Sequence, residues 1–504
     1  MIADELSYRI FQTLGLSPTH DQAAAANVFS RFITSGGSSS VMIMRGSAGT
    51  GKTFLAAAIV KTFVGLGQKV VLLAPTGRAA KVFSLGAGLP AYTVHRKIYR
   101  QKTFTGEMTG FNLGDNMHRN TLFIVDESSM IANGGYSETS VFGTGRLLDD
   151  LVTYVYSGDN CRLMLIGDKA QLPPVGEEES PALSADYMSG YGLEVFDCDL
   201  DEVLRQASGS GILYNATVIR QMVTHDELTL MPVIRLSGFA DISVVSGNDL
   251  IESLVSSYSR VGIDETMVVT RSNKRANIYN SGIRGMVLDR EEELCFGDLV
   301  MVVKNNYYWT EKAEKEAAAS ADDEKAPQTD VSAGGRDKTS SFLANGDRAR
   351  VLRVRNIREF YGCRFADVLL QFPDYDNSEL QTVVLLDSLM SEAPSLTAEQ
   401  SRRLFESILE DYMDIPQKAN RMKRIKQDPY YNALQIKYAY AVTCHKAQGG
   451  QWAEVYIDQG YMGSDSLTAD YIHWLYTAFT RASERLFLVN WPKSQTDGTT
   501  PDDD

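Results

Sequence analysis

The feature that most constrains how this chain folds is a glycine-rich segment, GSAGTGKT, at residues 46–53. It follows the apolar run VMIMR (41–45) and precedes the helix-like run FLAAAIVKTF. The segment fits G-x-x-x-x-G-K-[ST], a loop whose backbone N–H groups surround a phosphate group between a strand and a helix. The sequence therefore predicts an α/β domain with a phosphate-binding loop after a buried strand. A glycine-rich turn that binds nothing is the alternative.

Each position of this loop has an expected task. Lys52 reaches the β- and γ-phosphates of a nucleotide, and Thr53 holds Mg²⁺. The glycines allow backbone N–H groups to point into the loop. The predicted phosphate cradle consists of Gly46, Ser47, Ala48, Gly49, Thr50, Gly51, Lys52 and Thr53.

A second chemical signal is the apolar run LFIVDE (122–127), which ends in two acids. Asp126 is expected to hold Mg²⁺ through its water shell. Glu127 is expected to orient or deprotonate the attacking water. A solvated strand end is the alternative, and the cradle upstream favours the catalytic interpretation.

Two sets of short apolar runs, separated by helix-like segments, extend along the chain. The first set is VMIMR (41–45), VVLLAP (70–75), LFIVDE (122–127) and RLMLIGD (162–168). The second set is TMVVT (266–270), KYAYAVT (437–443), EVYID (454–458) and RLFLVN (485–490). Runs of this length, interleaved with helices, are typical of buried parallel strands. The fold class is therefore α/β, with two doubly wound parallel sheets.

The second set is interrupted by a segment of different character. Residues 311–340 are rich in Ala, Lys, Asp and Glu and almost lack large apolar residues, which predicts a solvated or disordered insert. Alternating runs follow, RARVLRVR (348–355), ADVLLQF (366–372) and QTVVLLD (381–387), and they predict a small β-barrel. A charged stretch with helical periodicity comes next.

The net charge and the local charge of the chain lead to different expectations about nucleic-acid binding. The net charge of −15, with a pI near 5.0, argues against nucleic acid if taken alone. Between Lys418 and Lys446, however, seven basic residues accompany a single acid, Asp428. Because net charge describes solubility more than it locates a site, the local basic track carries more weight.

Cysteine usage and hydropathy exclude several classes of protein. The five cysteines include no C-x-x-C pair, which argues against a disulfide framework and a zinc site. No apolar run approaches the roughly 18 residues of a membrane span. The N-terminus, MIADELSYRIFQ, lacks the layout of a signal peptide. We expect a cytoplasmic protein without a membrane partner.

Eight blocks in a fixed order resemble a known family. They are GSAGTGKT, APTGRAAKV (74–82), TVHRKIY (93–99), VDESSMI (125–131), GDKAQLPPV (167–175), LDEVLRQ (200–206), YAYAVTCHKAQGGQW (438–452) and YTAFTRASERLFLV (476–489). Together they resemble the superfamily 1 helicases, specifically the 5′→3′ branch of RecD-like and phage Dda-like enzymes. The resemblance extends over nearly the whole chain, and it implies ATP and Mg²⁺ as cofactors.

The resemblance implies further nucleotide-site residues. Gln22 is similar to the glutamine that reads adenine, and Gln171 to the residue that senses the γ-phosphate and couples it to DNA. Arg205 and Arg481 are similar to the two arginines that contact the γ-phosphate from the second lobe. An inserted arginine suits this task, because the transition state spreads negative charge over the γ-oxygens. Surface or structural roles for these side chains are the alternatives.

The resemblance also implies a track for single-stranded DNA. Backbone-contacting residues are expected at Thr76, Arg78, His95, Thr443, His445 and Lys446. Short polar and basic side chains suit phosphate oxygens without reading bases. Residues 97–120 are predicted to form a hairpin that splits the duplex, with Phe104 and Phe111 as candidates to meet the base pair. Core histidines and a surface hairpin are the alternatives.

The domain organisation follows from the same resemblance. We expect a first RecA-like domain at 1–200, with a hairpin insertion at about 92–120. A second RecA-like domain is expected at 201–305 and 434–494. An inserted SH3-like β-barrel domain is expected at 306–433, including the disordered segment 311–340 and a helical stretch at about 390–427. Residues 495–504 are predicted to form a disordered tail.

The predicted function is an ATP-dependent DNA helicase that moves 5′→3′ on single-stranded DNA. Expected partners are single-stranded DNA, ss/ds junctions, and a single-strand-binding or nuclease protein, with a monomeric helicase. A DNA-dependent translocase that displaces proteins but unwinds weakly is one alternative. A non-motor P-loop NTPase, such as a kinase or switch GTPase, is the other, and it would not need the TCHKAQG block.

Overall fold

The computed structural model describes residues 2–37, 39–101, 111–134, 143–202, 209–224, 231–306, 308–313, 343–462 and 467–497. The chain divides into two compact units. The first contains Met1–Tyr99, Asn112–Leu288 and Tyr440–Asp504, and the second contains Arg100–Phe111 and Asp289–Ala439. Among the described helices, none combines the length and the apolar character needed to cross a bilayer.

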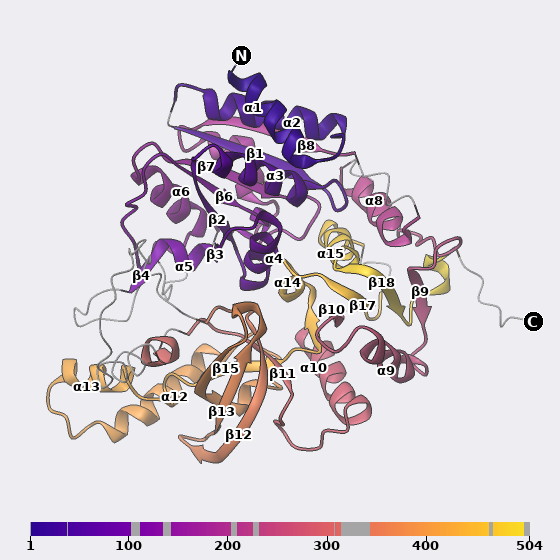
Figure 1. The fold of residues 1–504 in the computed structure, drawn as a ribbon. Coiled ribbons are helices and arrows are strands. Elements are labelled where there is room, and N and C mark those ends of the chain that lie inside the picture. The colour runs from indigo at the N-terminus through magenta and orange to yellow at the C-terminus, as the bar shows by residue number, and fades with distance from the viewer. Residues whose placement is uncertain are drawn as a thin grey trace, which may run out of the picture. The chain divides into compact units, whose positions relative to one another are not determined.

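The first unit contains a six-stranded parallel sheet with the strand order β3-β2-β6-β7-β1-β8 (Figure 1). The strands are β1 Ser40–Gly46, β2 Lys69–Ala74, β3 Ala91–Thr93, β6 Thr121–Val125, β7 Arg162–Gly167 and β8 Glu194–Leu200. The four apolar runs predicted as strands coincide with β1, β2, β6 and β7. The edge strand β8 was missed, because its sequence EVFDCDL alternates acids with apolar residues.

Helices surround this sheet and complete the first lobe, the name used here for the sheet and its helices. They are α1 Ile2–Leu14, α2 His20–Thr34, α3 Lys52–Gly65, α4 Gly77–Ala87, α5 Val94–Ile98, α6 Leu147–Ser157 and α7 Ala185–Ser189. Phe29, Phe32, Ile59 and Met42 lie in one buried core shared by α2, α3 and the sheet. Burial of such side chains, each stabilising by about 1.5–3 kcal/mol, fixes α3 directly behind the cradle loop.

The second lobe, also in the first unit, is a five-stranded parallel sheet in the order β16-β10-β17-β18-β9. Its strands are β9 Ile242–Val245, β10 Thr266–Thr270, β16 Ala441–Thr443, β17 Trp452–Asp458 and β18 Ala482–Val489. Its helices are α8 Gly211–Thr224, α9 Leu250–Arg260, α10 Asn273–Gly282, α14 Cys444–Ala447 and α15 Ala469–Phe479. The runs TMVVT, EVYID and RLFLVN were correctly predicted as strands.

The second unit is built on a closed five-stranded barrel. Its strands are β11 Leu299–Val302, β12 Arg348–Phe360, β13 Cys363–Phe372, β14 Ser378–Leu385 and β15 Leu434–Tyr438. Neighbouring strands are antiparallel, except that β14 and β15 are parallel. The turn between β12 and β13 has Tyr361 and Gly362 at φ of 57° and 66°, the backbone that a tight two-residue hairpin needs. Helices α12 Ala398–Asp411 and α13 Lys418–Lys426 fall within the stretch predicted to be helical.

The barrel differs from the sequence prediction at both ends. Strands β11 and β15 belong to it, although residues 299–302 and 434–438 lie outside the range 306–433. The run KYAYAVT is not one strand, because Tyr438 ends β15 of the barrel and Ala441 begins β16 of the second lobe. All the residues of β11 and β15 are buried, so nothing in their apolar pattern distinguished a barrel strand from a sheet strand.

Two predicted segments lie mostly outside the described residues. Strands β4 Tyr99–Gln101 and β5 Phe111–Leu113 form a two-stranded sheet within the predicted hairpin, and 102–110 are not described. The segment 314–342 and the tail 498–504 are likewise not described. Residues 495–497 depart from the prediction of a disordered tail, because the Asp497 carboxylate accepts a backbone hydrogen bond from Leu236 at 2.6 Å.

Short helical turns connect several of these elements. They are η1 Ser128–Met130, η2 Pro181–Leu183, η4 Ile283–Val287, η5 Pro373–Tyr375, η6 Leu386–Ser388 and η8 Lys493–Gln495. The first of them follows β6 directly, so the two acids that end the β6 run lie where the strand turns out of the sheet.

Candidate nucleotide site

The cradle loop joins β1 to α3, as the sequence predicted, and its glycines are required by its shape. Gly49 and Gly51 have φ of 80° and 77°, the left-handed region that favours glycine. A Cβ on Gly46 would lie 2.9 Å from Thr50 Oγ1 and 3.0 Å from the Cβ of Leu200. Helix α3 begins at Lys52, so the unpaired N–H groups of its first turn face the loop.

Lys52 lies inside this loop. Its Nζ donates to the backbone oxygen of Ser47 at 2.8 Å, and Thr50 Oγ1 donates to the same oxygen at 2.9 Å. The ammonium group is therefore held at the cradle by a backbone oxygen of the loop itself. This geometry suits a lysine that binds phosphate.

The candidate metal ligands come together at the end of β6. Thr53 Oγ1 lies 3.5 Å from Asp126 Oδ2, so a hydroxyl of the cradle and a carboxylate of the DE pair share one place. Burial and, to a smaller extent, the charge of Glu127 raise the pKa of Asp126 to about 7, whereas Lys52 opposes the shift. A buried carboxylate with a raised pKa, lying beside a hydroxyl oxygen, suits the binding of a hard cation such as Mg²⁺.

Glu127 has an unusual backbone. Its φ of 53° lies in the left-handed region, which is strained for a residue with a side chain. Its N–H donates to Asp126 Oδ1 at 2.9 Å. The turn therefore binds Asp126 Oδ1 to backbone, while Asp126 Oδ2 lies beside Thr53 Oγ1.

Gln22 is bound to the cradle from α2. Its Nε2 donates to the backbone oxygen of Thr50 at 3.1 Å, and its Oε1 accepts from the N–H of Thr19 at 3.2 Å. Thr19 Oγ1 in turn accepts from the N–H of Gln22, which completes a capping box at the start of α2. The structure therefore brings Gln22 to the nucleotide site, and its adenine-reading role stays a prediction.

A contact that the sequence did not predict joins α15 of the second lobe to the cradle. The hydroxyl of Tyr476 accepts from the N–H of Ala48 at 2.9 Å and donates to Asp168 Oδ2 at 2.7 Å. Asp168 also caps the turn after β7, because its Oδ1 accepts from the N–H of Ala170 at 3.0 Å. Its second oxygen makes it part of the interface between the lobes.

The loop that follows β7 is bound along the same face of α15. Thr477 Oγ1 accepts from the N–H of Leu172 at 2.7 Å, and His473 Nδ1 lies 2.9 Å from the oxygen of Ala170. Gln171 lies in the sequence between Ala170 and Leu172, which both contact α15, and it is only 6% exposed. Its Oε1 is buried and has no hydrogen-bond partner among the described residues. An unsatisfied polar group of this kind suits a residue that awaits a ligand.

Of the two predicted arginines, the structure describes Arg481, which is bound by residues of the second lobe. Arg481 is 2% exposed, and its guanidinium donates to the oxygens of Thr477 at 2.9 Å and Gly450 at 3.0 Å and to Thr480 Oγ1 at 3.0 Å. All three acceptors belong to the second lobe, so the structure holds Arg481 within its own lobe. Arg205 lies outside the described residues.

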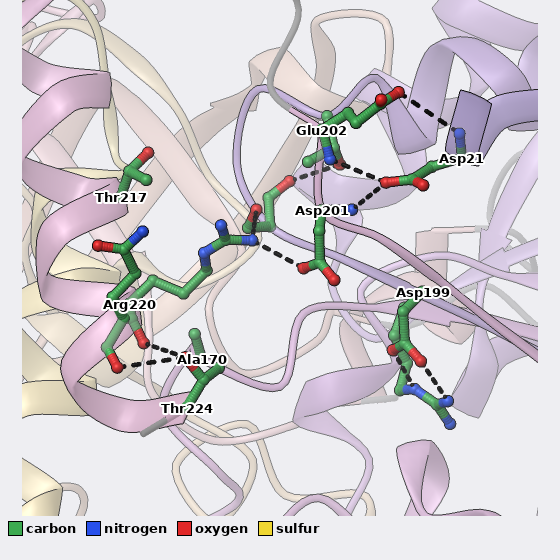
Figure 2. Close-up of polar contacts among 12 residues, drawn as sticks. Asp21, Ala170, Asp199, Asp201, Glu202, Thr217, Arg220 and Thr224 are labelled. Carbon is green, nitrogen blue, oxygen red and sulfur yellow. Dashed lines mark hydrogen bonds and ion pairs between the residues drawn. The ribbon is translucent and has the colours of Figure 1, made fainter. Parts of the chain in front are cut away.

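A different arginine reaches the cradle. Arg220 of α8 donates from Nη1 to Ser47 Oγ at 2.7 Å and to Asp201 Oδ1 at 3.0 Å (Figure 2). No sequence motif includes this position, and its one signal is a basic residue near the end of a largely apolar helix.

The predicted DNA residues fall into distinct environments. Thr76 caps α4 through a 3.2 Å hydrogen bond from the N–H of Ala79. A Cβ on Gly449, in the block TCHKAQGG, would lie 3.0 Å from Thr76 Oγ1, so the two predicted DNA-binding blocks of the two lobes are adjacent. Thr443 precedes α14, where His445 is exposed and Lys446 is partly buried.

Two residues of the predicted DNA track, Arg78 and His95, are partly buried. The guanidinium of Arg78 lies 4.6 Å from the centre of the Trp452 ring and donates to the oxygen of Gln451. Burial lowers the pKa of His95 to about 4, so its ring is neutral near pH 7. Phe111 begins β5 but its side chain is not described, and Phe104 lies outside the described residues.

Two family models match the chain. An AAA domain model matches residues 19–221, and a UvrD-like helicase C-terminal domain model matches 438–489. The first match contains the cradle and the DE pair, and the second contains α15 and Arg481. The chain belongs to the superfamily 1 helicases.

Relatives of this helicase differ in how much of their length they share with it. An uncharacterized protein of Acanthamoeba polyphaga mimivirus is 25% identical over 93% of this chain and 99% of its own. The ATP-dependent DNA helicase dda of Enterobacteria phage T4 is 24% identical over 51% of this chain and 55% of its own. The ATP-dependent RecD2 DNA helicase of Deinococcus radiodurans is 31% identical over 27% of this chain and 16% of its own. A Bacteroides Pif1 helicase structure with ADP-AlF3 and ssDNA covers 95% of this chain and 94% of its own, at 14% identity and a TM-score of 0.45.

Proposed function

We propose that this helicase hydrolyses ATP to move 5′→3′ along single-stranded DNA and to unwind duplex at ss/ds junctions. The observation that carries the proposal is the Tyr476 contact. One helix of the second lobe binds Ala48 of the cradle and also the loop that holds Gln171. Because hydrolysis changes what the cradle contains, it changes what the second lobe can bind, and this couples chemistry to lobe movement.

The residues of the first lobe supply the parts that hydrolysis needs. When bound, Mg²⁺–ATP supplies the γ-phosphoryl group, and Thr53 and Asp126 are the residues that would hold the metal. Lys52 binds the β- and γ-phosphates. Glu127 would accept a proton from a water whose oxygen bonds to the γ-phosphorus, while the bond from that phosphorus to the β,γ-bridging oxygen breaks and ADP and phosphate leave.

The strand is proposed to cross both lobes where Thr76 and Gly449 meet. We assign backbone contacts to Thr76, Thr443, His445 and Lys446, whose side chains can bind phosphate oxygens without reading bases. Arg78 joins them only if it leaves Trp452, and a neutral His95 contributes a hydrogen bond and not a charge. The names of the phage T4 and Deinococcus relatives support DNA as the nucleic acid.

The second unit is proposed to act at the junction. Its five-stranded barrel is consistent with the SH3-like module of the family, and residues 100–111 of the predicted hairpin belong to the same unit. Phe104 and Phe111 stay candidates for the pin that meets the first base pair. Helix α13 adds the basic residues Lys418, Arg421, Lys423, Arg424 and Lys426. A basic surface of this kind suits the phosphates of a duplex.

The test is ATP turnover with and without single-stranded DNA, using the wild-type chain and Lys52→Ala. We expect DNA to increase the turnover of the wild type. Lys52→Ala should lose turnover while keeping its melting temperature, because the ammonium group binds a loop oxygen and does not pack in the core. Wild-type turnover that ignores DNA would exclude the motor, and turnover retained by Lys52→Ala would exclude the cradle assignment.

A further inference from the structure

Among the residues that the structure describes, Arg220 is an arginine of the second lobe that contacts the cradle. Figure 2 shows its side chain extending from α8 toward Asp201, which follows β8 of the first lobe. The same Nη1 donates to Ser47 Oγ at 2.7 Å. The guanidinium therefore joins a helix of one lobe to the phosphate-binding loop of the other.

Ser47 is contacted by two cations at once. Lys52 Nζ binds its backbone oxygen at 2.8 Å, and Arg220 binds its hydroxyl at 2.7 Å. Lysine in this loop pattern binds the β- and γ-phosphates. Because Arg220 and Lys52 contact the same residue, Arg220 lies near the expected position of the γ-phosphate. A phosphate between these two cations would interact favourably with both.

The guanidinium has donors to spare. Arginine carries five N–H donors in a planar fork, and in the described part of the chain the hydrogen bonds of Arg220 come from Nη1 alone. The side chain is only 13% exposed, so water has limited access to the remaining donors. Arg481 contrasts with it, because Nε, Nη1 and Nη2 of that residue are all engaged by acceptors of its own lobe.

The present anionic partner of Arg220 is easily exchanged. The Asp201 side chain is 76% exposed, and an ion pair with such a carboxylate is weak because water competes for it. Asp201 nevertheless stays in place, since Asp21 Oδ2 accepts the N–H groups of Asp201 at 2.8 Å and Glu202 at 2.9 Å (Figure 2). Arg220 therefore has a fixed but weakly binding resting position beside the cradle.

We infer that Arg220 is a phosphate-contacting residue of the second lobe, which leaves Asp201 and binds the γ-phosphate of ATP held in the cradle. This inference rests on the proposed function. It gives the second lobe a contact that exists with ATP and disappears with ADP. Tyr476 is connected to this contact, because Ser47, which accepts from Arg220, directly precedes Ala48, whose N–H donates to the Tyr476 hydroxyl. Loss of the Arg220 contact would thus be felt where α15 binds Ala48.

The test compares the binding of β,γ-imido-ATP and ADP, each with Mg²⁺, to the full chain. In Arg220→Gln, the Kd for β,γ-imido-ATP should increase about tenfold or more, as expected for loss of a charge-assisted hydrogen bond, while the Kd for ADP stays unchanged. In Asp201→Asn, the resting partner is removed, so the Kd for β,γ-imido-ATP should decrease and that for ADP should not. Arg9→Gln is the matched control, because Arg9 forms an exposed ion pair with Glu5 on α1.

The outcomes separate this inference from the proposed function. If Arg220→Gln changes both Kd values equally, or neither, Arg220 is a structural residue and the inference is wrong. If wild-type turnover is absent or ignores DNA, the proposed function fails, whatever Arg220 does. Should Arg220→Gln not fold, Arg220→Lys decides, because it keeps the charge but loses the fork. An unchanged ratio of the two Kd values in both Arg220→Lys and Asp201→Asn would overturn the inference.

Discussion

Single residues in this helicase show how burial sets chemistry. Asp126 is buried and His95 is partly buried, yet burial acts on their pKa values in opposite directions, because it always disfavours the charged form. It raises the pKa of Asp126 to about 7 and lowers that of His95 to about 4. Asp126 therefore benefits from a nearby cation, whereas His95 is best accommodated as a neutral ring.

The pKa of His95 leads to a pH-dependent stability. The folded-state value of about 4 lies below the ordinary value of 6.5, so the unfolded chain binds the proton more readily between these limits. The stabilising contribution is present above pH 6.5 and is lost as the pH falls toward 4. From pH 7 to pH 5 the wild type should lose about 2 kcal/mol of unfolding free energy from this residue alone.

Denaturant unfolding of the wild type and His95→Gln at the two pH values measures this difference. The variant lacks the titrating ring, so its loss of stability between pH 7 and pH 5 should be smaller than that of the wild type. Equal losses in the two proteins would mean that His95 titrates normally and that burial does not hold its ring neutral.

At the scale of elements, the sequence predicted most of what backbone periodicity can specify. The apolar runs at β1, β2, β6, β7, β10, β17 and β18 were identified because each is a short, mainly apolar run between helix-like segments. Periodicity does not identify the neighbours of a strand, which explains why KYAYAVT was wrongly predicted as a single strand. Tyr438 and Ala441 are both buried, yet one belongs to the barrel and the other to the second lobe.

The difference between local sequence patterns and contacts across the fold also explains which site residues could be predicted. Lys52, Thr53 and Asp126 belong to local patterns whose chemistry is contained within a few residues. Tyr476 and Arg220 act across the two lobes, and their partners Ala48 and Ser47 lie far away in the sequence. Such contacts depend on how helices of the second lobe meet the first, which no local pattern specifies.

The face of α15 that binds the first lobe leads to a further prediction. In Tyr476→Phe, Asp168 Oδ2 loses a 2.7 Å hydrogen bond and the N–H of Ala48 loses its acceptor. We expect basal ATP turnover to persist and its stimulation by DNA to fall about 2–10-fold, which corresponds to one hydrogen bond. The measurement is the ratio of turnover with and without single-stranded DNA.

Tyr456→Phe provides the matched control for this variant. The hydroxyl of Tyr456 is also buried in the second lobe, where it lies 2.8 Å from Ser253 Oγ and 2.6 Å from Ser257 Oγ, away from the cradle. Both variants should lose about 1 kcal/mol of stability, but only Tyr476→Phe should lose DNA stimulation. A similar loss of stimulation in both would show that the effect is general destabilisation.

At the scale of the whole molecule, direction is the property that the fold leaves open. The two lobes are both parallel sheets, and a strand bound across Thr76 and Gly449 could be threaded either way. The expectation of 5′→3′ movement follows from the resemblance of the eight sequence blocks to the RecD-like and Dda-like branch.

Strand displacement on duplexes with a 5′ or a 3′ single-stranded tail decides the direction of movement. We expect ATP-dependent unwinding of the 5′-tailed duplex and none of the 3′-tailed or blunt duplex, with Lys52→Ala inactive on all three. Unwinding of the 3′-tailed duplex alone would reverse the assigned polarity, and unwinding of neither, with DNA-stimulated ATP turnover intact, would indicate a translocase.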